Sequence, residues 1–261
     1  MTADKRTGAI SRDAAIVVTG GASGIGRAVA LRQAHEGRAV AVWDLNGEGA
    51  EAVAAEIRSS GGRAIGVVCD VADRASVDSA RERSVSELGA VWGLVSNAGL
   101  DRLSLFKDGD PADWKLILDV NLVGALNVTH SLLPQMVEAG GGRIVCVSSD
   151  AARVGSTGEA VYAASKAGLL GFVKTLAREV ARNGIAVNVV CPGPTDTKLL
   201  AEVRSRENGE RIMEAMKRAI PMGRIAQPED IAGAIAFFLS DDAGYITGQV
   251  LSVSGGLTMV G

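Results

Sequence analysis

Three side chains between residues 149 and 166 are of types that can exchange a proton with an alcohol or a carbonyl oxygen. Ser149 offers a hydroxyl, Tyr162 offers a phenol, and Lys166 offers an ammonium four residues after the tyrosine. Residues four apart share one helix face, so a helix here would place the ammonium beside the phenol. The spacing therefore predicts a tyrosine that acts as a general acid and base.

The energy needed for that role is within reach of the lysine. An unperturbed tyrosine titrates near pH ~10, which is too high for a general base near neutrality. Lowering its pKa by about three units requires roughly 4 kcal/mol of preferential interaction with the phenolate. A nearby desolvated ammonium supplies energy on that scale. The pair alone is weak evidence, because an aromatic residue with a lysine one turn later is common on helices.

Length, charge and apolar content limit the classes of protein to which the chain can belong. Its 261 residues carry a net charge of −3 and suffice for one domain with a large core. The sequence has no basic stripe, which argues against nucleic acid and anionic membranes as partners. No apolar run approaches the ~20 residues that span a bilayer, and the polar N-terminus lacks a signal-peptide core. We expect a cytoplasmic protein.

The cysteines and histidines do not form the pattern of a metal site. Cys69, Cys146 and Cys191 are odd in number, and each lies in or at the end of an apolar, strand-like run. Buried free thiols explain them better than disulfides or metal ligands. His35 and His130 lie far apart in the sequence, so we expect no metal.

Short apolar runs alternate with helix-length amphipathic segments along most of the chain. Seven runs are predicted to be strands, at 14–20, 38–44, 64–70, 91–97, 142–149, 185–192 and 249–256. They are continuously apolar, as expected of strands covered on both faces. Helices are expected at 25–36, 48–59, 75–88 and 111–136. The alternation predicts a single α/β domain over residues 1–261, a Rossmann-type doubly wound parallel sheet of about seven strands flanked by helices.

A glycine-rich turn links the first expected strand to the first expected helix. Its residues are Gly20, Gly21, Ala22, Ser23, Gly24, Ile25 and Gly26. Glycines permit a tight turn, and they let backbone N–H groups and the helix N-terminus approach a pyrophosphate. A merely tight turn is the alternative, but a strand before and a helix after are the context of a dinucleotide site.

Polar residues close the next strands. Asp44 ends the second strand, where a carboxylate accepts hydrogen bonds from both adenosine ribose hydroxyls and repels a 2′-phosphate. Ser23 agrees, because that loop position holds no arginine to pair with a phosphate. A solvated acid is the alternative for Asp44, and we predict NAD rather than NADP. Asp70 and the residues 97–99 follow the third and fourth strands at the same, ligand-binding edge.

The chain resembles the short-chain dehydrogenase/reductase family through six motifs in the family's order. They are TGGASGIG at 19–26, CDV at 69–71, NAG at 97–99, Asn121 in VNLVG, Ser149 with YAASK at 162–166, and CPGPTDT at 191–197. The resemblance covers nearly the whole chain and implies hydride transfer between a secondary alcohol and NAD. Departures from the family pattern at residues 150–153 and at Thr195 bear on specificity.

The resemblance also implies a role for each motif residue. Tyr162 would exchange a proton with the substrate oxygen, Lys166 would lower its pKa, and Ser149 would bind the substrate oxygen. Asn121 would hold a kinked helix and a water that relays protons. Cofactor contacts would be Gly20, Ser23, Gly24, Ile25, Gly26, Asp44, Leu45, Asp70, Val71, Asn97, Ala98, Gly99, Tyr162, Lys166, Pro192, Gly193, Thr195 and Thr197, and substrate contacts Ser149, Ala151, Arg153, Glu159 and Tyr162.

The substrate is less constrained than the chemistry. Residues 198–220 are rich in charge and are predicted to be a mobile helical lid. Arg102, Arg153, Lys198, Arg204 and Arg206 could meet a CoA phosphate or could be solvated surface charges. The segments 148–166, 189–197, 218–230 and 248–261 are similar to those of family members that oxidise 2-hydroxycyclohexanecarboxyl-CoA. A cyclic or β-hydroxyacyl-CoA is therefore the favoured small-molecule substrate.

Other functions stay open. They are an NAD-linked hydroxysteroid or cyclic-alcohol dehydrogenase, a 3-oxoacyl thioester reductase, and a non-catalytic dinucleotide sensor. Asp44 disfavours an NADPH-linked reductase, and the presence of both Tyr162 and Lys166 disfavours a sensor. The apolar segments 231–239 and 249–253 suggest subunit contacts, and we expect a homotetramer, as in many family members.

Overall fold

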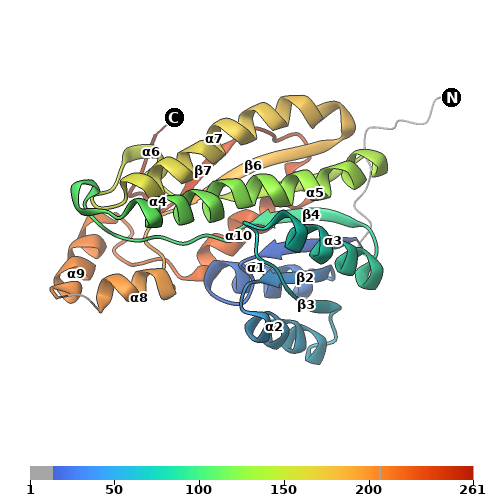
Figure 1. Ribbon diagram of the computed structural model, residues 1–261, viewed down its shortest axis with the longest axis horizontal. Helices are drawn as coiled ribbons and strands as arrows, with labels where there is room; N and C mark the ends of the chain where they lie inside the picture. Colours follow the sequence, from blue (N-terminus) through green and yellow to red (C-terminus); the bar gives the residue numbers. More distant parts are fainter. Residues whose placement is uncertain (1–13, 206, 261) are drawn as a thin grey trace.

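The seven predicted apolar segments form one parallel sheet in the computed structural model, which describes residues 14–205 and 207–260 (Figure 1). The strands are β1 (Ala15–Thr19), β2 (Ala39–Asp44), β3 (Ala64–Val68), β4 (Val91–Ser96), β5 (Gly142–Val147), β6 (Ile185–Pro192) and β7 (Val250–Val253). Their order in the sheet is β3-β2-β1-β4-β5-β6-β7. The strands β2 and β3 are added on one side of β1, and β4 to β7 are added on the other side. Where the order of strands reverses in this way, between β1 and β4, a crevice opens at the carboxyl ends of the strands.

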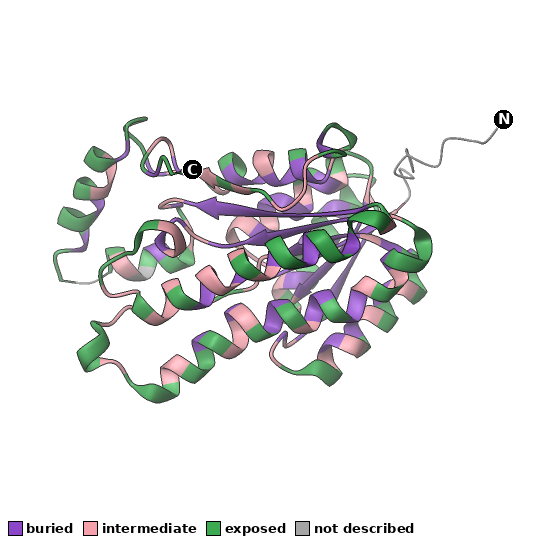
Figure 2. Cartoon of the chain, turned by 90° about the horizontal axis from the view of Figure 1, so that it is seen from above, coloured by how far each residue is buried: buried purple, intermediate pink, exposed green. Residues whose placement is uncertain are grey.

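Helices cover both faces of the sheet, which confirms the doubly wound Rossmann-type fold (Figure 1). One face packs against α1 (Gly24–His35), α2 (Gly47–Ser59) and α10 (Pro228–Phe238). The other packs against α3 (Arg74–Leu88), α5 (Gly124–Ala139) and α7 (Ala160–Val180). Figure 2 shows buried strands between helices whose outer faces are exposed. The continuous apolar runs in the sequence reflect this two-sided burial.

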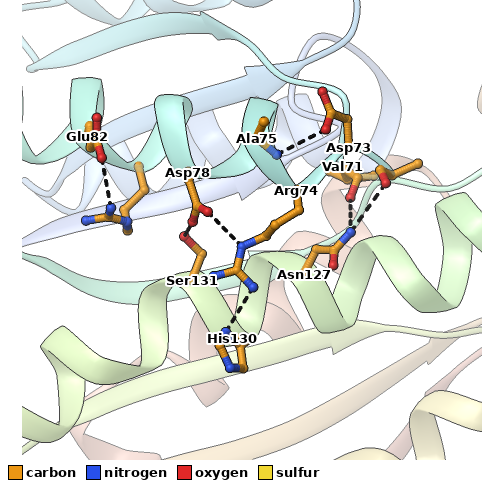
Figure 3. A network of polar contacts seen from close by, with 11 residues as sticks. Val71, Asp73, Arg74, Ala75, Asp78, Glu82, Asn127, His130 and Ser131 are labelled. Carbon is orange, nitrogen blue, oxygen red and sulfur yellow. Dashed lines mark hydrogen bonds and ion pairs between the residues drawn. The ribbon is translucent and has the colours of Figure 1, made fainter.

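Short polar side chains fix where several helices begin. Asn46 Oδ1 accepts a hydrogen bond from Gly49 N at the start of α2. Asp73 Oδ1 accepts one from Ala75 N at the start of α3, and α3 is joined to α5 by further polar contacts (Figure 3). Such caps satisfy N–H groups that the first helical turn leaves without partners, and each contributes about 1 kcal/mol.

The helix predicted at 111–136 is interrupted. It consists of α4 (Pro111–Leu118), a π-helical turn over Asp119–Val123, and α5, which continues to Ala139. A π-turn carries one extra residue per turn and is frequent at functional sites. The turn contains Asn121, so the expectation that this residue sits at an irregularity of the helix is confirmed.

The same stretch qualifies the expectation about membrane-spanning segments. By length and composition alone, residues 111–139 could cross a membrane. Four buried apolar residues of α5 nevertheless belong to the core between that helix and the sheet, namely Ala125, Val128, Leu132 and Met136. A core helix of this kind meets the same length and composition criterion, because its apolar face is turned toward the sheet.

The predicted lid is helical and has a small core of its own. It contains α8 (Lys198–Arg204) and α9 (Gly209–Ala219), which lie at one end of the sheet (Figure 1). A separate apolar cluster of Leu200, Met213, Ile220 and Ile225 holds this region together. The lid therefore packs as a unit distinct from the two cores that flank the sheet.

The C-terminal elements use most of their apolar residues inside the chain. Ile231, Ile235 and Phe238 of α10 are buried in the core that includes α1. Phe237 on α10 and Leu251 on β7 remain 42% and 41% exposed. The apolar character of residues 231–239 is thus explained mainly by intramolecular packing.

Candidate active site

A cavity of about 830 Å³ lies at the carboxyl ends of the strands, a volume typical of a site for a cofactor and a small molecule. It brings together residues from six of the seven strand ends and from the lid. Of the predicted site residues, all except Gly26, Asn121 and Arg153 line it. The sequence motifs therefore converge on one cavity, as the family resemblance implies.

The glycine-rich turn forms a cradle that larger residues would fill. Gly20 and Gly24 have positive φ angles of 62° and 53°, which favour glycine. A Cβ on Gly26 would lie 2.1 Å from the carbonyl oxygen of Gly20. Gly26 thus lies behind the cavity wall and allows α1 to start close to β1. The N-terminus of α1, which has no acidic residue in its first turn, is placed to receive a pyrophosphate.

Asn97 fastens this cradle to β4. Its Nδ2 donates to the carbonyl oxygens of Thr19 and Gly20 at 3.0 and 3.2 Å. The backbone N–H groups of Asn97 and Ala98 both donate to Thr19 Oγ1 at 3.0 Å. The Asn97 amide, expected to contact the cofactor, therefore also holds the two central strands in register at the crevice.

Asp44 points at the glycine-rich turn. One carboxylate oxygen accepts a hydrogen bond from Ala22 N at 3.0 Å, and the other accepts one from Asn46 N at 2.9 Å. Arg27, an arginine near this end of the cavity, forms an ion pair with Glu56 at 2.7 Å. The end of β2 thus presents a fixed carboxylate, and the guanidinium on α1 is already used by an acidic partner.

The turn after β3 is held by a network between α3 and α5 (Figure 3). Asn127 Nδ2 donates to the carbonyl oxygen of Val71 at 3.0 Å. On the neighbouring turn of α5, Ser131 donates to Asp78, which also accepts from Arg74 Nε. The network fixes Asp70 and Val71 at the cavity wall, in the place where the resemblance predicts cofactor contacts.

Tyr162 and Ser149 line the same cavity, as a proton-transfer site requires, but the pKa of the tyrosine is not lowered. Burial raises this pKa, the Ser149 hydroxyl opposes that rise, and the charges of Glu159 and Asp101 increase it. Desolvation of the phenolate is the largest influence on this pKa in the protein alone, and Lys166 Nζ lies 5.9 Å from the centre of the Tyr162 ring. The lowering of the Tyr162 pKa by Lys166 therefore stays a prediction for the protein with its cofactor bound.

Lys166 is a buried amine directed to the base of the cavity. It is 3% exposed, and its Nζ donates to the carbonyl oxygen of Val147 at 3.0 Å. Burial lowers its pKa from 10.5 to about 8. Gly99 makes room for it, because a Cβ there would lie 3.0 Å from Nζ. The amine is thus poised between its charged and neutral forms near neutral pH.

Asn121 lies behind the cavity and acts through its neighbours. Its Oδ1 accepts from Leu100 N at 2.8 Å, and its Nδ2 donates to Leu100 O at 2.9 Å and to Ser165 Oγ at 3.0 Å. The π-turn aims this amide at the loop after β4 and at α7, the helix that carries Tyr162. Asn121 is therefore a positioning residue in this structure, and the water relay assigned to it stays a prediction.

Arg153 does not face the cavity, contrary to the prediction. Its guanidinium donates to Ser252 Oγ at 2.8 Å and to the carbonyl oxygen of Val260 at 2.6 Å. Asp150 also contacts Ser252. The Arg153 guanidinium thus anchors the C-terminal segment. The predicted substrate contacts Ala151 and Glu159 do line the cavity.

The other basic residues that were predicted to contact an anionic substrate group differ in where they lie. Arg102 and Lys198 line the cavity, and Arg204 does not; Arg206 lies outside the described residues.

Asp101, which the sequence reasoning missed, is 5% exposed and lines the cavity beside Tyr162. Its position two residues after the NAG motif, beyond the carboxyl end of β4, was the available signal. The three cysteines are buried and free, as predicted.

Comparisons with known proteins agree with this geometry. A family model described as enoyl-(acyl carrier protein) reductase matches residues 20–258. D-threitol dehydrogenase of Mycolicibacterium smegmatis is 40% identical over 93% of this chain and 92% of its own. The 3-oxoacyl-(acyl-carrier-protein) reductase FabG of Thermotoga maritima is 37% identical over 93% and 97%. The crystal structure of levodione reductase superposes with a TM-score of 0.90 at 30% identity, covering 94% of this chain and 97% of that one.

The buried amine yields a test of the site's electrostatics. Lys166→Met removes a charge whose burial costs on the order of 3 kcal/mol below pH 8. Removal of this cost should raise the free energy of unfolding of the variant at pH 7. We expect a gain of about 1–3 kcal/mol and not the full cost, because the Val147 carbonyl loses its hydrogen-bond donor. Between pH 8 and 10.5 the folded wild type loses this proton while the unfolded chain keeps it, so wild-type stability rises and the gain shrinks.

Urea unfolding at pH 7 and pH 10 measures this difference. Lys174→Met, an exposed lysine on the same helix α7, is the matched control and should gain nothing at either pH. A Lys166→Met variant that is no more stable than the wild type at pH 7 would contradict the account of the buried charge.

Proposed function

The chain belongs to the short-chain dehydrogenase/reductase family, and from that premise we propose that it is an NAD-dependent secondary-alcohol dehydrogenase with Tyr162 as its acid and base. Members of this family bind a nicotinamide dinucleotide and act on CH–OH or C=O groups. The observation that carries the proposal is that Ser149, Tyr162 and the buried Lys166 line one cavity, which also presents Asp44.

Each residue of the proposed mechanism acts through a specific atom. Ser149 Oγ binds the substrate oxygen, and the Tyr162 hydroxyl takes its proton during oxidation or returns it during reduction. When bound, the dinucleotide supplies the hydride acceptor, and its oxidised ring adds a positive charge to the cavity. That charge favours the phenolate, which the protein alone disfavours. Lys166 holds the ribose end in place and adds its own charge below about pH 8.

The preference for NAD rests on the adenosine end. The Asp44 carboxylate is fixed by two backbone N–H groups, so it cannot turn away from a 2′-phosphate without losing them. The Arg27 guanidinium is paired with Glu56 and is not directed to the cavity. Together these groups favour a ribose with both hydroxyls and disfavour NADP.

For the substrate we propose a cyclic secondary alcohol. Part of the cavity lining is apolar, with Leu103, Val154 and the lid residues Leu199, Val203 and Met216, and this suits a carbon ring. A β-hydroxyacyl-CoA such as 2-hydroxycyclohexanecarboxyl-CoA is the second candidate. It is favoured by the likeness to a 3-oxoacyl reductase, because a β-hydroxyacyl thioester is the reduced form of the same group.

We also propose that the enzyme is a cytoplasmic homotetramer whose lid, residues 198–220, closes over the substrate. The exposed Phe237 and Leu251, together with Tyr245 and Met259, supply apolar surface for subunit contacts. The separate core of the lid supports its movement as a unit.

The role of Tyr162 can be tested by removing one oxygen atom. Tyr162→Phe keeps the ring and its packing but removes the proton donor and acceptor. We expect kcat to fall by at least ~100-fold, the range for general acid–base catalysis, while the Kd for NAD changes by less than about threefold. Steady-state rates of NADH formation and fluorescence titration measure the two quantities. Turnover that stays within a few fold of wild type would remove Tyr162 from the mechanism.

The role of Asp44 in the preference for NAD can be tested by comparing the two cofactors in Asp44 variants. Asp44→Ala removes the charge that repels a 2′-phosphate, so the ratio of kcat/KM for NAD to that for NADP should fall at least about tenfold. Asp44→Asn, which keeps an acceptor for one backbone N–H, separates charge from loop support and should show most of the same fall. An unchanged ratio in both variants would mean that another group reads the ribose.

A further inference from the structure

Two carboxylates lie beside Tyr162 on the substrate side of the cavity. Glu159 precedes α7 and stands one helical turn before the tyrosine, and Asp101 lies in the segment after β4, only 5% exposed. Both carboxylates line the same cavity as Tyr162, and their negative charges raise the pKa of its hydroxyl. Neither charge helps to form a phenolate, so general acid–base catalysis does not explain why they are there.

The two carboxylates are held in place by loops that are fastened together. Asn121 fixes both backbone groups of Leu100, the residue before Asp101. Ser104 N donates to the carbonyl oxygen of Gly158 at 2.9 Å, which ties the loop after β4 to the residue before Glu159. Gly158 has a φ of 84°, a conformation that favours glycine, and a Cβ there would lie 3.0 Å from Leu103. The arrangement is therefore built by the fold.

Both carboxylates also border a second cavity of only about 20 Å³, on whose wall Tyr162 also lies. Asp101, Glu159 and Tyr162 belong to the walls of both cavities. The far side of the smaller cavity is formed by Phe106 and Trp114, whose rings stack with centroids 4.9 Å apart. A space of this size takes a group no larger than a hydroxyl or an amine, and its lining combines the carboxylates with Arg102 and the two stacked rings.

The chemistry of this wall selects the substituent. An ionised carboxylate only accepts hydrogen bonds, so it stabilises a neighbouring hydroxyl or ammonium and repels a carboxylate or phosphate. Asp101 Oδ1 already accepts from Arg102 N at 2.7 Å. Burial and the charge of Asp101 raise the pKa of the Glu159 carboxyl, so its effect on a donor grows as the pH rises. A carbonyl oxygen, itself only an acceptor, gains nothing there. The wall therefore discriminates by the donor character of the group that lies next to the reacting carbinol.

We propose that Glu159, with Asp101, is a specificity-determining wall that accepts a hydrogen bond from a donor on the carbon adjacent to the reacting carbinol, so that the favoured substrates are vicinal diols or vicinal amino alcohols. This inference rests on the proposed dehydrogenase function and narrows it. It also favours the cyclic alcohol over the acyl-CoA candidate, whose adjacent carbon bears a thioester carbonyl.

The test compares cyclic substrates that differ only in the adjacent group. Initial rates of NAD reduction are measured with trans-1,2-cyclohexanediol, trans-2-aminocyclohexanol, cyclohexanol, 2-hydroxycyclohexanecarboxylate and 2-hydroxycyclohexanecarboxyl-CoA. We expect kcat/KM for the diol or the amino alcohol to exceed that for each of the other three at least tenfold, the lower range for a charge-assisted hydrogen bond. The diol and amino-alcohol arms show whether a neutral or a cationic donor is preferred.

The variants assign the preference to the wall. In Glu159→Gln, and separately in Asp101→Asn, the ratio of kcat/KM for the preferred substrate to that for cyclohexanol should fall at least fivefold, chiefly through a higher KM for the preferred substrate. Glu179→Gln, an exposed glutamate on the same helix α7, is the matched control and should leave the ratio unchanged. Because Asp101 is buried, the Glu159 variant keeps the test valid if Asp101→Asn fails to fold.

Two contrary outcomes are distinguishable. Oxidation of cyclohexanol or of the thioester at rates equal to or above those of the diol and amino alcohol would overturn the inference and leave the dehydrogenase function intact. Absence of turnover with every alcohol would overturn the proposed function together with the inference. A donor preference that persists in Glu159→Gln would overturn the role of that residue.

Discussion

The site depends first on the hydrogen bonds that join the ends of β1 and β4. Asn97 and Ala98 donate four hydrogen bonds from three nitrogen atoms to Thr19 and Gly20, where the strand order reverses. These bonds close the backbone of two adjacent strands around the crevice, so that the glycine cradle, the Asp44 carboxylate and the loop that carries Asp101 keep fixed relative positions. Rigid placement of this kind is the protein's main contribution when a cofactor performs the redox chemistry.

Within that frame, the reacting residues are held at an energetic cost. Burial disfavours the charged forms of both Lys166 and Tyr162, and it moves their pKa values in opposite directions. The protein alone therefore keeps the proton on the phenol. In the proposed mechanism, the positive charge of an oxidised dinucleotide would favour the phenolate, so that proton transfer would be coupled to cofactor binding.

The sequence predicted the fold and the cavity well because both follow from local patterns. Seven continuous apolar runs, the glycine-rich turn and polar residues at strand ends specify a parallel sheet and its ligand edge. The errors concern interactions that depend on distant residues. Arg153 is used by Ser252 and Val260, and in the protein alone the Tyr162 pKa is raised by burial and by the charges of Glu159 and Asp101. None of these has a signature in the neighbouring sequence.

Deuterium transfer tests the central claim, that this cavity couples oxidation of a secondary alcohol to NAD, most directly. The enzyme is mixed with NAD and a cyclic secondary alcohol that carries deuterium on its carbinol carbon, and the reduced dinucleotide is analysed by mass spectrometry. The account predicts one deuterium at the nicotinamide C4 position, together with slower turnover than for the unlabelled alcohol in single-turnover experiments. Reduced dinucleotide without the label, or no reduced dinucleotide from any secondary alcohol, would contradict it.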